Sequence, residues 1–259
     1  MLFAVDIGNT NIHVGFFRGY EPVHTFTLST DSRRTSDEYA LLLRNLTEFA
    51  GYEAEDFRGA ILGSVVPSAT EVIASAIKKL LNFPPMTVGP GIKTGFSIRV
   101  DNPSELGADL AANTAAAIHT VGAPAFVVDF GTATTVSVVS EDRAYLGCCI
   151  LPGVGMSLKA LASTELLPGV QTAERVPLLG TNSADSMNAG VIHGQCMAVT
   201  GLIRELIRAK NFSSDTPVLL TGGFGERLVP YLPEKTRYIP NLTLRGLAVI
   251  YQANQKNKR

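Results

Sequence analysis

The sequence has no tryptophan, only three cysteines among its 259 residues, and no excess of charge of either sign. Lysine and arginine number 22 and aspartate and glutamate 23, so the formal net charge is -1. Basic residues gather only in the tail at 255–259. A nucleic-acid-binding protein neutralises several phosphates from a basic surface, so this balance argues against a nucleic-acid partner.

The cysteines do not form a pattern typical of a disulfide framework or a zinc site. Cys148 and Cys149 are adjacent, Cys196 stands alone, and no pair has the CxxC spacing. Such thiols suit buried apolar positions in a reducing compartment better than metal ligation or disulfide bonding. We therefore expect a cytoplasmic protein.

Long hydrophobic runs are also missing. Asp6 interrupts the first apolar run, and no later run approaches the roughly 18 residues of a membrane span. Secretion and membrane insertion both lose support. The composition, 46% hydrophobic and 17% charged, is that of a compact soluble protein with a substantial core. Its length predicts one or two domains, and we expect two.

Apolar runs and turn signals alternate along the chain. Capping boxes at Thr35–Glu38 and Ser68–Glu71 indicate two helix starts. A Gly- and Pro-rich connection at 83–107 leads to an alanine-rich helix, and 122–124 is a plausible domain seam. Predicted strands cover 2–7, 12–17, 23–28, 59–66, 125–130, 135–140, 145–151 and 218–221, and predicted helices 35–49, 68–81, 108–119, 183–210 and 244 onward.

A repeated strand-turn-strand unit is the most informative feature. Residues 5–10 and 128–133 share the form apolar-Asp-apolar-Gly-polar, and Asp6 and Asp129 are 123 residues apart. One such match would mean little, because turns often use Asp and Gly. Two matches with the same flanking strands, one in each half, favour two domains of related topology facing one another across a cleft.

Glycine-rich hairpins of this kind predict phosphate binding. Their backbone N–H groups and short hydroxyls converge on one point, which suits anionic oxygens. Because an ionised carboxylate repels phosphate, Asp6 and Asp129 would act through a bound cation or an ordered water, as in a nucleotide triphosphate bound with Mg²⁺. The alternative is that both side chains only satisfy turn amides.

A third glycine turn follows the strand at 218–221. Gly222 and Gly223 permit close backbone approach to a flat group such as adenine or ribose, although alone they could form only a turn. After the two phosphate-type loops, this turn arrives in the order expected of the ASKHA superfamily, which includes acetate and sugar kinases and actin.

Four stretches together resemble type III pantothenate kinases, and they span nearly the whole chain. They are Asp6–Asn11, Asp101–Asp109, Asp129–Thr135 and, as a weaker match, Gly180–Met187. The resemblance implies an α/β fold of two ribonuclease H-like (actin-like ATPase, ASKHA) domains with a central cleft. We expect an N-terminal domain at 1–120, with the first phosphate loop and the substrate segment, and a C-terminal domain at 121–259.

The resemblance also implies an activity: ATP-dependent phosphorylation of the primary hydroxyl of pantothenate, the first step of coenzyme A synthesis. It implies Mg²⁺ with ATP, a monovalent cation (K⁺ or NH4⁺) on Asp129, and a homodimer. The expected ATP-binding residues are Asp6, Gly8, Asn9, Thr10, Asn11, His13, Gly131, Thr132, Gly222 and Gly223, Asp6 being also a possible Mg²⁺ ligand through water. The expected substrate-binding residues are Val100, Gly107, Ala108, Asp109, Leu110 and Ser183.

Asp109 is the expected general base. A carboxylate at the start of a helix can accept the hydroxyl proton during in-line phosphoryl transfer, which typically contributes about 10²- to 10⁴-fold in rate. The competing interpretation is that Asp109 is the N-cap of the alanine-rich helix. By spacing alone the two interpretations are balanced, and the resemblance favours catalysis.

The departures from the family pattern concentrate at the second substrate. Leu110 stands where the family usually has Arg, Val100 where many members have Tyr, and Ser183 where it has a substrate-binding Thr. Ser137 replaces an acidic residue after the second phosphate motif. Either another cation compensates, or the pocket has changed its guest and the chain is a nucleotide-binding paralogue, a regulator or a kinase for another small hydroxy acid. The candidate compensating cations are Lys93 and Arg99.

Overall fold

The computed structural model describes residues 1–164, 166–169, 172 and 175–255. It divides into two compact units, Met1–Thr120 with Asn241–Arg259, and Val121–Pro240. The division near residue 120 coincides with the boundary expected from the sequence. The segment from 241 onward belongs to the first unit, whereas the sequence predicted it within the C-terminal domain at 121–259.

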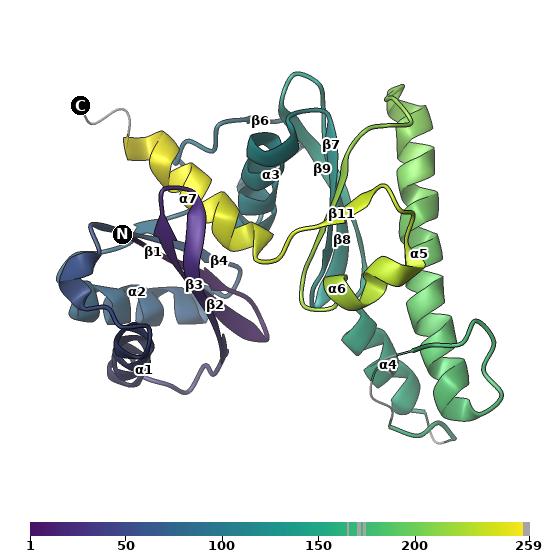
Figure 1. Cartoon of the computed structure of the whole chain (residues 1–259), viewed down its shortest axis with the longest axis horizontal. Coiled ribbons are helices and arrows are strands. Elements are labelled where there is room, and N and C mark those ends of the chain that lie inside the picture. The colour runs from purple at the N-terminus through teal and green to yellow at the C-terminus, as the bar shows by residue number, and fades with distance from the viewer. Residues whose placement is uncertain (165, 170–171, 173–174, 256–259) are drawn as a thin grey trace. The chain divides into compact units, whose positions relative to one another are not determined.

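The first unit is built on one five-stranded sheet (Figure 1). Its strand order is β3-β2-β1-β4-β5, with β1 antiparallel to β2 and parallel to β4. The strands are β1 (Leu2–Ile7), β2 (Asn11–Arg18), β3 (Glu21–Ser29), β4 (Gly59–Ser64) and β5 (Met86–Thr87). The helices are α1 (Ser36–Phe49), α2 (Pro67–Leu81), α3 (Ala108–Val121) and α7 (Leu242–Gln255), and the short strand β6 (Ser97–Ile98) lies in the connection before α3.

The second unit contains its own mixed sheet, in which five of its strands run in the order β9-β8-β7-β10-β11. β7 is antiparallel to β8 and parallel to β10. The strands are β7 (Ala125–Phe130), β8 (Ala133–Val139), β9 (Ala144–Pro152), β10 (Val218–Thr221) and β11 (Thr236–Tyr238). The helices are α4 (Val154–Ala162), α5 (Ser183–Lys210) and the short α6 (Gly225–Leu228).

The two sheets repeat one topology. In each, three antiparallel strands are followed by two parallel strands on the far side of the first strand. Asp6 and Asp129 occupy the same place, one residue before the end of the central strands β1 and β7. The duplication inferred from the repeated motif is therefore confirmed in the fold of each unit.

Alternation along β1 assigns its residues to two buried faces. Phe3, Val5 and Ile7 pack against α1 and α2, whereas Leu2 and Ala4 pack against α3 and α7. Successive side chains of a strand point to opposite faces, so Asp6 shares the face that α3 and α7 cover. The apolar stripe of α7 needs this face for burial, which explains why the last helix folds with the first unit.

The core of the second unit lies between its sheet and the long helix α5. Phe126, Val128 and Phe130 of β7 pack in one cluster with residues of α4 and α5. The 28-residue length of α5 agrees with the predicted helix 183–210 at both ends. Its N-cap, Asn182, accepts the N–H of Asp185 through its side chain.

Of the two capping boxes predicted from the sequence, the structure contains one. The capping box at α1 is confirmed, because the Thr35 hydroxyl accepts the Glu38 N–H and the Glu38 carboxylate accepts the Thr35 N–H. The capping box expected at Ser68 is wrong: α2 begins at Pro67, which needs no N–H bond at the first helical position. Through the described part of the chain, every helix is too short or too polar to cross a membrane.

Gly246 of α7 lies against the backbone of α3. A Cβ at this position would lie 2.8 Å from Ala112 Cα and closer still to the Ala112 carbonyl, and backbone cannot move aside as a flexible side chain can. We expect Gly246→Ala to lower the free energy of unfolding by about 1–3 kcal/mol through overpacking. Urea unfolding followed by circular dichroism measures the change.

The matched control is Gly194→Ala, at a helix position of α5 where a Cβ meets nothing within 4 Å. Alanine is a better helix former than glycine by roughly 0.5–1 kcal/mol, so this control should unfold at equal or higher urea. Equal unfolding midpoints for the two variants would contradict the close packing of α7 on α3.

Candidate functional site

The first hairpin loop closes on itself at the end of β1. Gly8 donates its N–H to the Asn11 carbonyl at 2.9 Å, and a Cβ on Gly8 would crowd that same oxygen at 3.1 Å. From β3 onward, the Thr30 hydroxyl donates to the Gly8 carbonyl at 2.7 Å and the Thr30 N–H to Thr10 at 3.0 Å. The glycine thus shapes the turn, and the exposed tip consists of residues 9–11.

Asp6 and His13 face each other across β1 and β2, since they are paired in the antiparallel register. Asp6 is only 9% exposed. Burial lowers the pKa of His13, and its Nδ1 lies 3.1 Å from the Thr27 hydroxyl. A lowered pKa keeps the imidazole neutral at physiological pH. His13 therefore offers hydrogen bonding rather than positive charge beside the first loop.

Asp109 lies at the same end of the first sheet as Asp6. Gly63 of β4 is paired with Asp6 in the parallel register, and a Cβ on Gly63 would lie 3.6 Å from the Cβ of Ala108. The structure thus brings together the expected phosphate residue Asp6 and the expected substrate segment at Ala108 and Asp109. Parallel strands β1 and β4 both end here, which is where α/β sheets usually bind ligands.

Asp109 is the second residue of α3, so the N-cap interpretation is wrong. Its Oδ1 accepts the N–H of Leu110 at 2.8 Å. Burial raises the pKa of Asp109, and hydrogen bonds from the amides of Leu110 and Asp109 oppose this shift. A Cβ on Gly107 would collide with this same Oδ1, so glycine at 107 leaves space for the carboxylate.

The other expected substrate residues fall in both units. Val100 and Leu110 are partly buried in the first unit, while Ser183 is exposed as the first residue of α5 in the second. Lys93 and Arg99, the two cations that could compensate for the missing Arg, are both exposed. The backbone of Lys93 is fixed by Asn254 of α7, which bonds both its N–H and its carbonyl.

The second hairpin loop repeats the closure of the first. Gly131 donates its N–H to the Ala133 carbonyl at 3.1 Å, and Thr132 is exposed at the tip. Asp129 is paired with Thr221 of β10 in the parallel register. The expected loop residues Asp129, Gly131 and Thr132 therefore stand in the same relation as those of the first loop.

The glycine turn after β10 lies directly against Asp129. Gly222 has φ +93°, and a Cβ there would lie 2.6 Å from Phe130 N and closer to Asp129 Oδ1. The next contact is the Phe224 N–H, which bonds the Phe130 carbonyl at 3.1 Å. The sequence predicted Asp129 in the second loop and Gly222 in a separate glycine turn, and the structure brings the two residues together. Gly223 is open, with nothing within 4 Å of its Cβ position.

Three residues beside the second loop were not found from the sequence. A Cβ on Gly153 would lie 2.5 Å from the Gly131 carbonyl oxygen. Tyr238, at the end of β11, has a pKa raised by burial and by the charges of Glu226 and Asp129. Gln195 of α5 bonds Thr134. Of the three, only Gly153 could have been found from the sequence, because the pair Pro152–Gly153 directly after a predicted strand is a turn signal.

The donor groups limit how metal can bind. Within the described ranges, no cluster of three or more His, Cys, Asp or Glu residues could hold a metal ion. Mg²⁺ commonly takes only one or two carboxylates and completes its octahedron with water and phosphate, which fits a lone Asp6. The Asp129 carboxylate lies beside Gly131 and Gly222, which have no side chains to crowd a cation bound to it.

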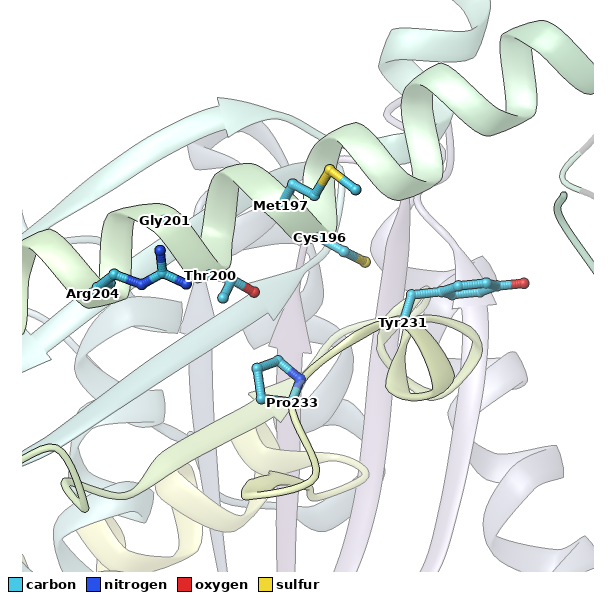
Figure 2. Close-up of a pocket in the computed structure, with 7 residues that line it drawn as sticks. All are labelled: Cys196, Met197, Thr200, Gly201, Arg204, Tyr231 and Pro233. Carbon is cyan, nitrogen blue, oxygen red and sulfur yellow. The ribbon is translucent and has the colours of Figure 1, made fainter. Parts of the chain in front are cut away.

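A pocket of about 440 Å³ lies elsewhere in the second unit, between α5 and the segment around 231–233 (Figure 2). Figure 2 shows the side chains that surround it, namely Cys196, Met197, Thr200, Arg204, Tyr231 and Pro233 along with Gly201. Its lining residues belong to neither hairpin loop nor the glycine turn. The loops, and not this pocket, therefore remain the candidate site.

Gly222 offers a test of the second loop. We expect Gly222→Ala to lower the free energy of unfolding by about 1–3 kcal/mol, because it imposes a positive φ on an L-residue and a clash with Phe130. Nucleotide affinity should fall as well, since Asp129 must move. Thermal unfolding and calorimetric titration with a non-hydrolysable ATP analogue measure both.

The control is Gly223→Ala, the next residue, which has space for a methyl group. It should leave thermal stability unchanged, so any loss of affinity there reports close approach of the nucleotide. If Gly222→Ala were as stable as the unsubstituted protein and bound the analogue equally well, the contact between this turn and Asp129 would have no role.

Comparison with known proteins agrees with this arrangement. The family model described as type III pantothenate kinase matches residues 2–205. Type III pantothenate kinases from Moorella thermoacetica and Halalkalibacterium halodurans are 40% and 39% identical, each covering 98% of this chain and 100% of the relative. The structure of (R)-2-hydroxyglutaryl-CoA dehydratase component A from Acidaminococcus fermentans superposes with a TM-score of 0.59 at 14% identity, covering 98% of both chains.

The likeness to that solved structure, together with the repeated sheet topology, confirms the expected ASKHA fold. The identity to the two relatives extends over nearly the full length of the chain. Asp6 and Asp129 lie near the ends of β1 and β7, and Asp109 lies at the start of α3. The chain belongs to the type III pantothenate kinase family.

Proposed function

We propose that the protein transfers the terminal phosphoryl group of ATP to the primary hydroxyl of pantothenate, forming 4′-phosphopantothenate for coenzyme A synthesis. The observation that carries the proposal is the partly buried Asp109 carboxylate at the start of α3, beside the first phosphate loop. Burial raises its pKa, which makes the ionised carboxylate a better proton acceptor than that of an ordinary aspartate.

The phosphates are bound in this proposal by the exposed tips of the two hairpins. The expected contacts are residues 9–11 and His13 in the first unit and Thr132 in the second, with Gly8 and Gly131 holding the turns. The base of the nucleotide approaches Gly222 and Gly223. Mg²⁺ bound with ATP supplies charge neutralisation at the transferring phosphoryl group, with Asp6 holding it through water.

Asp129 is assigned to a monovalent cation, K⁺ or NH4⁺. On the acceptor side, Val100, Gly107, Ala108 and Leu110 contact pantothenate from the first unit, and Ser183 contributes from the second. During transfer, Asp109 accepts the proton of the attacking hydroxyl as the oxygen forms its bond to phosphorus. We place this reaction in the cytoplasm.

The proposal includes a homodimer. Exposed large apolar side chains concentrate between β9 and the middle of α5, where Ile150 is 68%, Leu179 81% and Met197 63% exposed. Exposed apolar side chains that gather into one surface patch are typical of interaction surfaces. A second copy of the chain is the proposed occupant, and sedimentation equilibrium of the purified protein measures the state.

Leu110 favours a second candidate function. An acid substrate usually meets a cation, and the family's Arg is absent here. A nucleotide-binding relative that phosphorylates a different acceptor, or that regulates without transfer, would retain both loops and lose this charge. The two candidates differ in whether ADP release depends on pantothenate.

Asp109→Asn tests the leading proposal. The amide keeps the shape and can still accept the Leu110 N–H, but it cannot take a proton, so we expect kcat to fall by about 10²- to 10⁴-fold. For the unsubstituted enzyme, activity should decline with falling pH through the raised pKa of Asp109, above the ordinary value of about 3.9. A coupled assay of ADP release measures both.

Stability separates catalysis from folding in this variant. Because the pKa of Asp109 is raised in the folded chain, ionisation disfavours the native state above that pKa, and the penalty is absent below the unfolded value. Asp109→Asn removes the penalty, so its thermal stability at pH 7 should equal or exceed that of the unsubstituted protein. Unaltered turnover, or loss of activity only with unfolding, would contradict the assignment.

Leu110→Arg tests the acceptor. A hydrogen bond to a charged group contributes roughly 1.5–3 kcal/mol, so restoring the cation should lower the KM for pantothenate about tenfold or more if the rest of the pocket suits this acid. Leu110→Met is the control, with an uncharged side chain of similar size. An unchanged KM for Leu110→Arg would support the second candidate, and a screen of other hydroxy acids would follow.

A further inference from the structure

Gln195 is a polar side chain in an apolar part of α5. Its helix neighbours Val191, Ile192, Cys196 and Val199 belong to the core of the second unit, and Gln195 itself is 8% exposed. A buried amide is costly unless its oxygen and nitrogen are both hydrogen-bonded. The partners of Gln195 therefore show what its place in the core achieves.

Both ends of the amide are bonded to residues near the second hairpin loop. Its Oε1 accepts the hydroxyl of Thr134 at 2.9 Å, and its Nε2 donates to the carbonyl of Pro152. The Ser157 hydroxyl lies 3.4 Å from the same Nε2. Thr134 is fully buried, so water cannot replace the amide as its partner.

Thr134 and Pro152 hold the loop from two sides. Thr134 follows the tip residue Thr132 by two positions on β8, and Pro152 on β9 is paired with Ala133. Gly153, next to Pro152, packs against the backbone of Gly131 and Thr132. A Cβ on Gly153 would lie only 2.8 Å from Thr132 C. Movement of Pro152 relative to Thr134 would therefore displace the loop.

We propose that Gln195 is a positioning residue that holds the loop Gly131–Thr132 in the geometry that binds nucleotide. The amide accepts from Thr134 and donates to Pro152 at once, and these two bonds join α5 to residues 61 and 43 positions earlier in the chain. The proposal rests on the proposed nucleotide role of this loop. It assigns no contact between Gln195 and the substrates.

The experiment removes the bonds while keeping the volume. Gln195→Met loses both, and Gln195→Glu keeps an acceptor for Thr134 but loses the donor to Pro152. Thr134→Val removes the hydroxyl, and Thr134→Ser restores it. Gln252→Met, on α7 of the first unit, is the matched control. Each variant is titrated calorimetrically with a non-hydrolysable ATP analogue well below its unfolding temperature, and steady-state KM values for ATP and pantothenate are measured in parallel.

We expect Gln195→Met and Thr134→Val each to weaken analogue binding and raise the KM for ATP by about three- to tenfold, as loss of one or two hydrogen bonds implies. Thr134→Ser should bind within twofold of the unsubstituted protein. The double variant should be little worse than either single one, because both break the same link. The KM for pantothenate should stay within twofold.

A folded Gln195→Met protein that binds the analogue within twofold of the unsubstituted protein would overturn the proposal, leaving Gln195 a residue of core stability only. The same holds if the two single substitutions weaken binding additively. Analogue binding does not require pantothenate, so these outcomes are separate from failure of the proposed function, which would appear as absent pantothenate turnover in the unsubstituted protein.

Discussion

A carboxylate at the end of a central strand needs empty space beside it, and much of this structure follows from that requirement. In the first unit, the neighbour of Asp6 on the parallel strand is Gly63, and in the second, Asp129 is flanked by Gly131 and Gly222. A Cβ on Gly131 or Gly222 would lie within 3.3 Å of Asp129 Oδ1, whereas a Cβ on Gly63 would meet Leu247 and Ala108, which pack on that face of the first sheet. Gly131 and Gly222 therefore leave space for the Asp129 carboxylate, and Gly63 leaves space for α3 and α7 on the face that carries Asp6.

The two units meet this requirement differently, although their topology is the same. After β4, the N–H of Val65 bonds the Ile7 carbonyl, and after β10 the N–H of Phe224 bonds the corresponding Phe130 carbonyl. The second unit has one more residue between the strand and this bond, and Gly222 absorbs it with a positive φ. The backbone is open at the next residue, Gly223, whereas in the first unit the start of α3, which carries Asp109, lies beside Gly63 of β4. One topology thus carries a glycine turn beside the aspartate in one copy and the start of a helix in the other.

Local signals in the sequence predicted the features that depend on neighbouring residues. The two hairpins, the capping box of α1 and both ends of α5 depend on turn and cap chemistry within a few positions, and all are confirmed. Other features depend on residues far apart in the chain. They are the position of α7, the close contact of Gly153 with the second loop and the hydrogen bonds of Gln195. No periodicity or motif encodes which distant strand a helix will cover, and a glutamine within an apolar stripe gives no indication of its partner. The N-cap interpretation of Asp109 failed for a related reason, because Gly107 moves the helix start one residue earlier than the carboxylate.

Two side chains at the candidate site of the first unit bring no positive charge to it. His13 is kept neutral by burial, and Leu110 has no charge to offer, so neither side chain balances a phosphate or an acid group. The carboxyl groups of Asp6 and Asp109 lie at the same end of the first sheet and add no positive charge. In the proposed function, attraction for ATP at this edge comes from cations bound together with the nucleotide, which act only when the ligand is in place, and from backbone dipoles. In the proposed reaction this arrangement keeps the acceptor side free of a fixed cation that would lower the pKa of Asp109, and so preserves its strength as a base.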